Sequence, residues 1–530
     1  MPGSRDLVNF RIVFMSKVLV KSTGMVSLLT FISRIFGFIR DMVTAYFFGA
    51  TAAFDAFLVA FKIPNFMRRL FAEGAFSQAF VPVLSEYQKQ KTQAELKQFV
   101  NAMAGSLGIV LLLVTILGVV TAPWIVRLFA AGFEVGSPRY DLAVTMLRIT
   151  FPYLMLISLT AFSGAILNTH SRFWVAATTP IFLNICMISA AIWLAPTMHT
   201  PIIALAWAVF VAGVIQLLFQ LPFLKNLGLA IRPRINFRDP GVRKVLKLMV
   251  PALFGVSVSQ VNLLVDTLFA SFLIVGSVSW LYYSDRLLEL PLGVFGVAIA
   301  TVILPSLSRH HATQSQVAFS QTVDWALRCI LLISVPASLV LVILAGPLLS
   351  TLFQYGTLFT AYSVEMAAKS LAMFGIGVIP FMLIKVLTSG FYARQNMRTP
   401  VRIGIIAMIA NIIFNCGFIG FLAHAGIALA TSLAAGLNAV LLWYFLQKEN
   451  LYTPSSGWGF FSLRLLFVNV LLGVWLWMSA PGLSQWVQAD GIWRITHLLF
   501  SLGGGIVLYF IALYLSGLRI HDFLIREASI

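Results

Sequence analysis

The segment FISRIFGFIRDMVTAYFFGA (residues 31–50) has the length and apolar content of a membrane-spanning helix, yet it contains Arg34, Arg40 and Asp41. An arginine at the centre of a membrane helix costs about 2.5–3.5 kcal/mol when lipid surrounds it. These side chains therefore cannot face lipid. They must either pair with acids inside the protein or line a water-filled cavity.

The whole chain has the composition of a membrane protein. Of its 530 residues, 60% are hydrophobic and only 10% are charged, and the mean hydropathy is +0.93. Apolar runs of about 20 residues, long enough to cross a bilayer, recur along almost the whole length. We predict an all-α polytopic membrane protein with about fourteen transmembrane helices.

The positive charge follows the pattern of membrane topology. The formal charge is +18, and much of the Lys and Arg lies in breaks on one side of the apolar runs, such as residues 86–98 and 225–247. This positive-inside pattern predicts that both termini are cytoplasmic, and it argues against a nucleic-acid partner.

The sequence gives no sign of catalytic chemistry. Cys186, Cys329 and Cys416 lie in apolar runs, and the histidines show no zinc-ligand spacing. No GxxxxGK[ST] phosphate loop occurs, so ATP hydrolysis by this chain is not expected. We predict a transporter with no catalytic residues and no resident cofactor.

The two halves of the chain resemble each other at an offset of about 225 residues. IALA occurs at Ile203 and again at Ile427, and the Ser-Gly at Ser163 recurs at Ser389. A duplication of six spans predicts two pseudo-symmetric six-helix lobes related by an axis along the membrane normal. The predicted order is a cytoplasmic N-terminal segment (1–21), an N-lobe (22–224), a basic cytoplasmic linker (225–246), a C-lobe (247–447), two further C-terminal helices (448–516) and a cytoplasmic tail (517–530).

Further charges lie in the second and eighth apolar segments. The predicted cavity residues are Arg34, Arg40, Asp41, Asp55, Lys62, Arg68, Glu73 and Arg286. With Arg69 included, five cations meet three carboxylates in the first two spans. Because the planar guanidinium group suits phosphate, this excess predicts a cationic cavity for an anionic substrate. Ion pairs that only hold helices in register remain the alternative.

Three of these segments resemble the signature segments of a known family. They are SRIFGFIRD (33–41), ATAAFDAFLVAFKIPNFMRRLFAEGAFSQAFVPVLSEY (50–87) and GSVSWLYYSDRLLELPLGVFGVAIATVILPSLS (276–308). The chain is similar, essentially end to end, to the MurJ (MviN) lipid II flippases of the MOP exporter superfamily. The resemblance implies a flippase that moves lipid II, the undecaprenyl-diphosphate-linked peptidoglycan precursor, from the cytoplasmic to the periplasmic leaflet of the bacterial inner membrane.

The resemblance also implies roles for particular residues. In the family, arginines at the positions of Arg34, Arg40, Arg68 and Arg286 line the cavity and are needed for function. The last two spans form a hydrophobic groove for the lipid tail. The implied partners are lipid II and membrane lipids, and an association with the cell-wall synthesis machinery is left open.

The energy source is left open between the membrane potential and sodium coupling. Some family members hold a sodium ion in the second lobe. The candidate ligands here are Asp266, Asn411, Asn415 and Thr431. Hydrogen bonding between helices is the interpretation that the sequence favours for these four residues.

Three other functions are compatible with parts of the pattern. The chain could flip another polyprenyl-diphosphate-linked glycan or be a different MOP-type exporter, although a drug exporter would favour an acidic or aromatic chamber. A membrane enzyme acting on polyprenyl phosphates would need a carboxylate-metal or histidine centre near an interface. A scaffold for cell-wall enzymes would not need Arg34 or Arg286.

Overall fold

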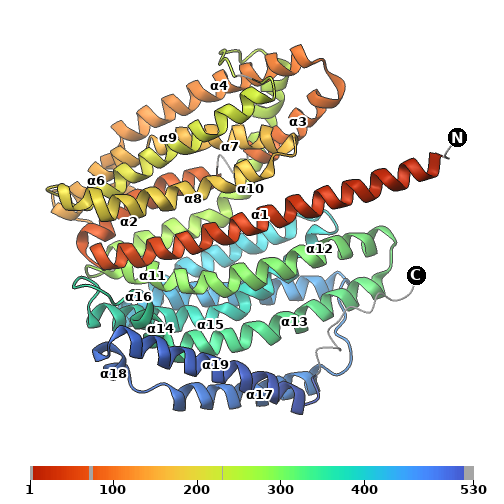
Figure 1. Cartoon of the computed structure of the whole chain (residues 1–530). Helices are drawn as coiled ribbons and strands as arrows, with labels where there is room; N and C mark the ends of the chain where they lie inside the picture. The colour runs from red at the N-terminus through yellow and green to blue at the C-terminus, as the bar shows by residue number, and fades with distance from the viewer. Residues whose placement is uncertain (1–3, 71–73, 75, 230, 519–530) are drawn as a thin grey trace. The chain divides into compact units, whose positions relative to one another are not determined.

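The computed structural model describes residues 4–70, 74, 76–229 and 231–518, with the side chains of residues 4–23, 252–259 and 297 left aside. This part of the chain is helical throughout and contains no strand (Figure 1). The predicted all-α polytopic class agrees with this architecture.

The helices of the first half are α1 (Ser4–Phe48), α2 (Ala52–Arg68), α3 (Phe76–Gln90), α4 (Gln93–Val120), α5 (Ala122–Phe129), α6 (Pro138–Thr150), α7 (Tyr153–Thr169), α8 (Phe173–Ser189), α9 (Ile203–Asn226) and α10 (Pro240–Ser271). Those of the second half are α11 (Ser277–Pro291), α12 (Val297–Ala312), α13 (Gln316–Ile343), α14 (Ala345–Phe353), α15 (Ala361–Tyr392), α16 (Arg398–Lys448), α17 (Trp458–Ser479), α18 (Leu483–Gln488) and α19 (Gly491–Leu515). Single π-helical turns extend α8 at Ala190–Leu194 and join α11 to α12 at Leu292–Gly296.

Ten helical segments in the described part of the chain are long and apolar enough to cross a membrane. The longest, α16, has 51 residues and is interrupted at Ala423, whose φ of 48° and ψ of −128° are not helical. Because about 20 helical residues cross a bilayer, α16 has the length of two spans. The charged segments α1 and α2 are not among the ten, and the count of fourteen stays a prediction.

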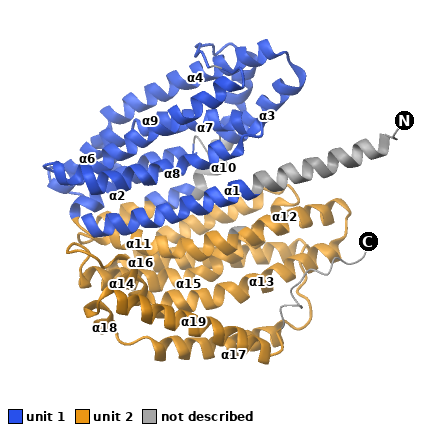
Figure 2. Ribbon diagram, viewed as in Figure 1, with its two compact units in different colours: residues 1–48, 52–264 blue, residues 49–51, 265–530 orange. Residues whose placement is uncertain are grey.

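The chain forms two compact units (Figure 2). The first contains Met1–Phe48 and Ala52–Leu264, and the second contains Gly49–Thr51 and Val265–Ile530. The division falls inside α10, whereas the sequence places the boundary in the basic segment 225–246. The division into two six-helix lobes joined by a linker at 225–246 stays a prediction. The C-terminal helices α17 to α19 belong to the second unit.

Aromatic side chains form the core at one end of the first unit. Phe76 and Phe80 of α3 stack with ring centroids 5.0 Å apart, and the Phe80 ring lies 5.1 Å from that of Phe162 on α7. All three side chains are buried together with Phe99 of α4. Large aromatic side chains contribute much apolar contact area, so they fix α3, α4 and α7 against one another.

Polar side chains set where several helices begin. Thr92 and Glu95 form a capping box at the start of α4, with the backbone N–H of each residue donating to the side chain of the other. Asp239 accepts hydrogen bonds from the backbone N–H groups of Gly241 and Val242 at the start of α10. Such caps satisfy N–H groups that have no partner inside the helix.

Residues 232–236 of the basic linker lie against α4. The backbone N–H groups of Arg232 and Arg234 donate to the side-chain and backbone oxygens of Asn101, at 2.8 and 3.0 Å. The N–H of Asn236 donates to Ser106 Oγ at 3.1 Å. The linker therefore binds α4 through its own backbone N–H groups, and this attachment does not use its side chains. Several of its basic side chains are exposed.

The second unit attaches its C-terminal helices through a buried carboxylate on α13. Asp324 accepts hydrogen bonds from the Tyr452 hydroxyl at 2.9 Å, Ser455 Oγ at 2.6 Å and Trp458 Nε1 at 2.6 Å. Burial, together with this contact to Asp324, raises the pKa of the Tyr452 phenol well above its usual value. Tyr452 thus stays a neutral donor, and the segment that precedes α17 is held by Asp324.

A glycine on α4 is required where the linker passes. A Cβ atom at Gly105 would overlap the backbone carbonyl group of Arg234, whereas one at Gly108 would meet nothing within 4 Å. Gly105→Ala should lower the free energy of unfolding by about 1–3 kcal/mol, the usual range for overpacking. Gly108→Ala should be neutral or stabilise by up to about 1 kcal/mol, since alanine is the better helix former. Thermal midpoints in detergent measure both, and equal midpoints for the two variants would contradict the packing of the linker on α4.

Candidate functional site

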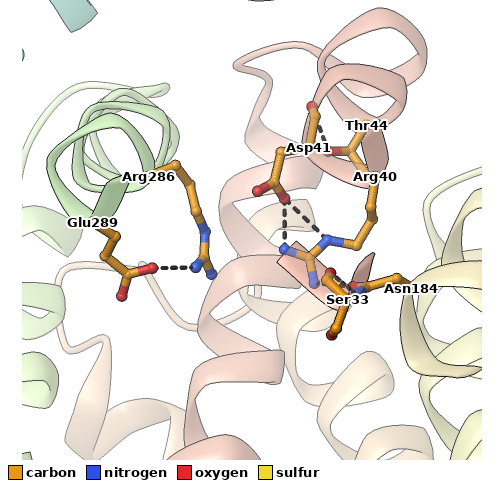
Figure 3. Close-up of polar contacts among 7 residues, drawn as sticks. All are labelled: Ser33, Arg40, Asp41, Thr44, Asn184, Arg286 and Glu289. Carbon is orange, nitrogen blue, oxygen red and sulfur yellow. Dashed lines mark hydrogen bonds and ion pairs between the residues drawn. The ribbon is translucent and has the colours of Figure 1, made fainter. Parts of the chain in front are cut away.

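Arg40 and Asp41 form a buried ion pair in the first unit (Figure 3). Arg40 Nε and Nη2 donate to Asp41 Oδ1 at 3.0 and 2.7 Å. The two side chains are only 8% and 3% exposed. Both come from α1, so the positive charge of Arg40 is balanced by its neighbour in the sequence, and a second helix is not needed to neutralise it.

Asn184 of α8 adds a contact that sequence reasoning missed. Its Oδ1 accepts a hydrogen bond from Arg40 Nη1 at 3.1 Å, and its Nδ2 donates to the backbone oxygen of Ser33 at 3.1 Å (Figure 3). Asn184 is 6% exposed. A lone asparagine in the otherwise apolar run FLNICMI was the available signal, because a buried amide needs partners for both ends.

Asp55 has a different environment from Asp41. It is fully buried, and its Oδ2 accepts a hydrogen bond from Nη2 of Arg139 on α6 at 2.8 Å. The Arg139 guanidinium also lies over the Phe133 ring, 3.9 Å from its centroid. Sequence reasoning placed Arg139 in a break between spans and missed this pair. The pair joins α2 to α6, which is the structural alternative that the sequence left open for such carboxylates; a cavity role for Asp55 stays a prediction.

The other predicted cavity residues of the first unit lie along α1 and α2. Arg34 is exposed, and Lys62 is half-buried. Arg68 is also half-buried, and its Nε donates to Asn65 Oδ1 at 2.9 Å, one turn earlier in α2. Glu73 lies outside the described residues. Substrate contacts by these residues stay predictions.

Arg286 lies on α11 in the second unit. Its Nη1 donates to Glu289 Oε2 at 2.8 Å (Figure 3), and its guanidinium lies 4.8 Å from the centroid of the Tyr282 ring. The side chains of Arg286 and Glu289 are 27% and 49% exposed. Ion pairs that water can reach are weak, so this pair can open at far lower cost than the buried one at Asp55.

The four candidate sodium ligands of the second unit do meet. Asp266 Oδ1 accepts hydrogen bonds from Nδ2 of Asn411 and Asn415 at 2.9 and 3.0 Å, and its Oδ2 accepts one from Thr431 Oγ1 at 3.1 Å. The expected hydrogen bonding between helices is confirmed. The Oδ1 atoms of Asn411 and Asn415 are buried and have no hydrogen-bond partner.

These two amide oxygens, which lie beside a carboxylate, allow the fit of the site to a cation to be tested. Sodium prefers oxygen ligands, as other hard cations do. If each amide rotated by half a turn, its Oδ1 would face Asp266. A cation between them would then be bound by both amide oxygens. Together with the Asp266 carboxylate and the Thr431 hydroxyl, the amides form an oxygen donor set with one formal negative charge. The residues present therefore fit a monovalent cation.

Arg494 shows a third way in which this chain holds a buried arginine. It is 6% exposed, and its Nη1 and Nη2 donate to the backbone oxygens of Ser350, Gln354 and Val487 at 3.2, 2.9 and 2.9 Å. These carbonyls lie at or near the C-terminal ends of α14 and α18. Helix C-termini carry partial negative charge, so this arginine joins three helices and needs no substrate to explain it.

Comparisons with known proteins identify the family of this chain. The family model described as "Lipid II flippase MurJ" matches residues 44–496. The chain belongs to the MurJ family. A probable lipid II flippase MurJ of Haemophilus influenzae is 46% identical over 512 residues, which cover 94% of this chain and 100% of the relative. The lipid II flippase MurJ of Burkholderia cenocepacia is 42% identical, over 93% of this chain and 96% of the relative.

Solved structures give the same answer at the level of fold. A lipid II flippase MurJ in an inward closed conformation matches with a TM-score of 0.78 at 27% identity, covering 94% of this chain and 99% of the other. An inward-facing multidrug resistance MATE family transporter of the MOP superfamily matches with a TM-score of 0.63 at 14% identity, covering 79% and 95%. The MATE likeness is one of fold alone.

The pair between Asp55 and Arg139 should be a major source of stability. Arg139→Met removes this cation from a fully buried carboxylate and should cost about 3–5 kcal/mol of unfolding free energy. Adding Asp55→Leu to Arg139→Met should recover most of the loss, because an apolar pair can replace a buried ion pair. Lys244→Met, which opens the exposed pair with Glu86, is the matched control and should cost about 0–1 kcal/mol. Thermal midpoints that fall equally for Arg139→Met and Lys244→Met would contradict this assignment.

Proposed function

We propose that this chain is a lipid II flippase that moves its substrate from the cytoplasmic to the periplasmic leaflet by alternating access through a central cationic cavity. The proposal rests on membership of the MurJ family over nearly the whole chain. Its finer parts are fourteen transmembrane helices in two six-helix lobes and a C-terminal pair, a location in the bacterial inner membrane, and cytoplasmic termini. An association with cell-wall synthesis enzymes belongs to the same proposal.

The cationic residues explain how a diphosphate could cross. A charged head group cannot enter hydrocarbon without losing its hydration, which is very costly. Guanidinium groups replace that hydration with charge-assisted hydrogen bonds, often two to one phosphate. Arg34, Arg40, Arg68 and Arg286 supply such groups, and the polyprenyl tail remains in lipid throughout. No covalent bond forms or breaks, so the function needs no enzyme chemistry.

Release requires that the arginines have a second partner. In this structure, Asp41 forms an ion pair with Arg40, and Glu289 forms one with Arg286. Phosphate oxygens would compete with these carboxylates for the same N–H groups. Exchange of one anion for another keeps the guanidinium groups compensated in every state, and it prevents the substrate from binding too tightly to leave.

The C-terminal helices supply a surface for the lipid tail. A groove of about 610 Å³ runs between α17 and α19, and its wall is almost entirely apolar. It includes Leu463, Phe467 and Leu471 from α17, and Leu508 and Ile511 from α19. Such a groove matches a polyprenyl chain in its apolar chemistry and supports the assignment of segment 448–516 as a lipid-tail groove.

The proposed energy source is the membrane potential or a sodium gradient. The potential acts on charge at about 2.3 kcal/mol per elementary charge per 100 mV, which is enough to bias a cationic lobe. Sodium would be held by Asp266, Asn411, Asn415 and Thr431, with both amides turned to present Oδ1. A bound cation there would tie α10 to both parts of α16.

A flippase for another polyprenyl-diphosphate-linked glycan is the second candidate. The same phosphate chemistry favours it, since the arginines would contact the diphosphate and not the sugar. A drug exporter fits less well, because the cationic residues on α1 and α2 would repel the cationic drugs for which an acidic chamber is suited.

Substitution of exposed arginines tests the flippase directly. In cells that depend on this protein, Arg34→Ala and Arg286→Ala should each reduce periplasmic exposure of lipid II at least about tenfold, the effect of losing one charge-assisted contact. Arg127→Ala, at an exposed arginine on α5, removes the same charge and should have little effect. Normal exposure with both Arg34→Ala and Arg286→Ala, at wild-type protein levels, would reject the cavity assignment.

Sodium binding should be visible as a change in stability. A ligand at 100 times its dissociation constant stabilises a folded protein by about 2.7 kcal/mol. Sodium chloride should therefore raise the thermal midpoint of the wild-type protein more than potassium chloride does at equal concentration. Asp266→Asn should remove this difference, because it removes the only formal charge of the donor set. A sodium effect that survives in Asp266→Asn would place the ion elsewhere.

A further inference from the structure

The contacts of Asn184 go beyond those of a buried amide that only fills space. Asn469, by comparison, donates only to the Leu465 carbonyl one turn earlier in its own helix, and its Oδ1 is buried without a hydrogen-bond partner. Asn184 instead uses both ends, one on Arg40 and one on the backbone of Ser33. We propose that Asn184 is the positioning residue that holds Arg40 in place for the diphosphate of lipid II, an inference that rests on the proposed function.

The chemistry of the two partners specifies an amide. A guanidinium group can only donate hydrogen bonds, and a backbone carbonyl can only accept them. A side chain that bridges the two must therefore offer an acceptor and a donor about one amide width apart. Asparagine does so, and its orientation follows from the partners. Aspartate lacks the donor, and leucine, which has a similar size, lacks both.

The neutrality of Asn184 is as important as its geometry. Arg40 and Asp41 together carry no net charge, and an amide fixes the guanidinium without changing that sum. A carboxylate at position 184 would also bind Arg40, but it would leave the group with a net negative charge. Such a group would repel a diphosphate, and the repulsion would weaken as salt screens it.

Asn184 also gives Arg40 a fixed point during exchange of anions. When phosphate displaces Asp41, the bonds of Arg40 Nε and Nη2 to that carboxylate are lost, whereas the bond from Nη1 to Asn184 does not involve Asp41. The guanidinium then stays next to α8 and does not follow the phosphate. Because Asn184 is itself bound to the Ser33 carbonyl, one side chain joins α1 and α8 at the level of the binding arginine (Figure 3).

A double-mutant cycle tests whether Asn184 acts through Arg40. Lipid II binding is titrated with the purified full-length protein for wild type, Asn184→Leu, Arg40→Ala and the double variant. Asn184→Leu should weaken binding about tenfold, the loss expected for one hydrogen bond that fixes a charged group. In the Arg40→Ala background the same substitution should change binding less than about twofold, because there is no guanidinium left to position.

Two further variants separate positioning from folding. Thr179→Val alters another buried polar residue of α8, whose hydroxyl bonds only within its own helix, and should bind lipid II like wild type. Asn184→Asp should weaken binding at least as much as Asn184→Leu at low salt, and its deficit should shrink at high salt while that of Asn184→Leu does not. The thermal midpoint of each purified variant is measured as well, and binding is compared only among variants whose midpoints equal that of the wild type.

The outcomes distinguish the inference from the proposed function. Equal losses from Asn184→Leu with and without Arg40, or wild-type binding by Asn184→Leu, would overturn the positioning role while leaving the flippase intact. Absence of lipid II binding by the wild type, or wild-type binding by Arg40→Ala, would reject the proposed role of Arg40 and the inference with it. If Asn184→Leu weakens lipid II binding only when Arg40 is present, and Asn184→Asp shows the expected salt dependence, the result supports both the inference and the proposed function.

Discussion

Charge compensation is the constraint on which this structure depends, because a buried guanidinium group must be balanced inside the protein. The chain meets this requirement in three ways. Arg40 is balanced by Asp41, its neighbour on the same helix; Arg139 by Asp55, which comes from another helix; and Arg494 by carbonyls near helix ends. Each solution has a different mechanical consequence.

An ion pair between helices cannot open without loosening their packing. The bond from Arg139 to Asp55 joins α6 to α2 across 84 residues of sequence, and Asp55 is fully buried. The pair of Arg40 with Asp41, by contrast, lies within α1, and the pair of Arg286 with Glu289 lies within α11. Opening either pair separates two side chains of one helix and breaks no ion pair between helices. Pairs within one helix are therefore suited to binding and release, and pairs between helices are suited to holding the fold.

The sequence predicts those features of the fold that leave a trace in helical periodicity or in the internal duplication. The family resemblance directed attention to Asp266, Asn411, Asn415 and Thr431, and hydrogen bonds do join the last three residues to Asp266. Asn184 and Arg139 were missed because their partners are set by the packing of α8 on α1 and of α6 on α2. Periodicity assigns a residue to a face of its helix, but it does not say which helix covers that face.

The attachment of the last two helices follows from the same physics. Lipid tails are as apolar as leucine side chains, so burial of apolar surface gives little force to bring helices together within a bilayer. The chain instead fixes the segment before α17 to α13 through Asp324 and holds Tyr509 of α19 by a hydrogen bond to the Leu332 carbonyl at 2.6 Å. α17 and α19 are themselves joined by polar bonds, since Trp475 Nε1 donates to the Ser501 carbonyl and Ser501 Oγ donates to the Ser479 carbonyl. Hydrogen bonds therefore fix the C-terminal helices both to α13 and to each other.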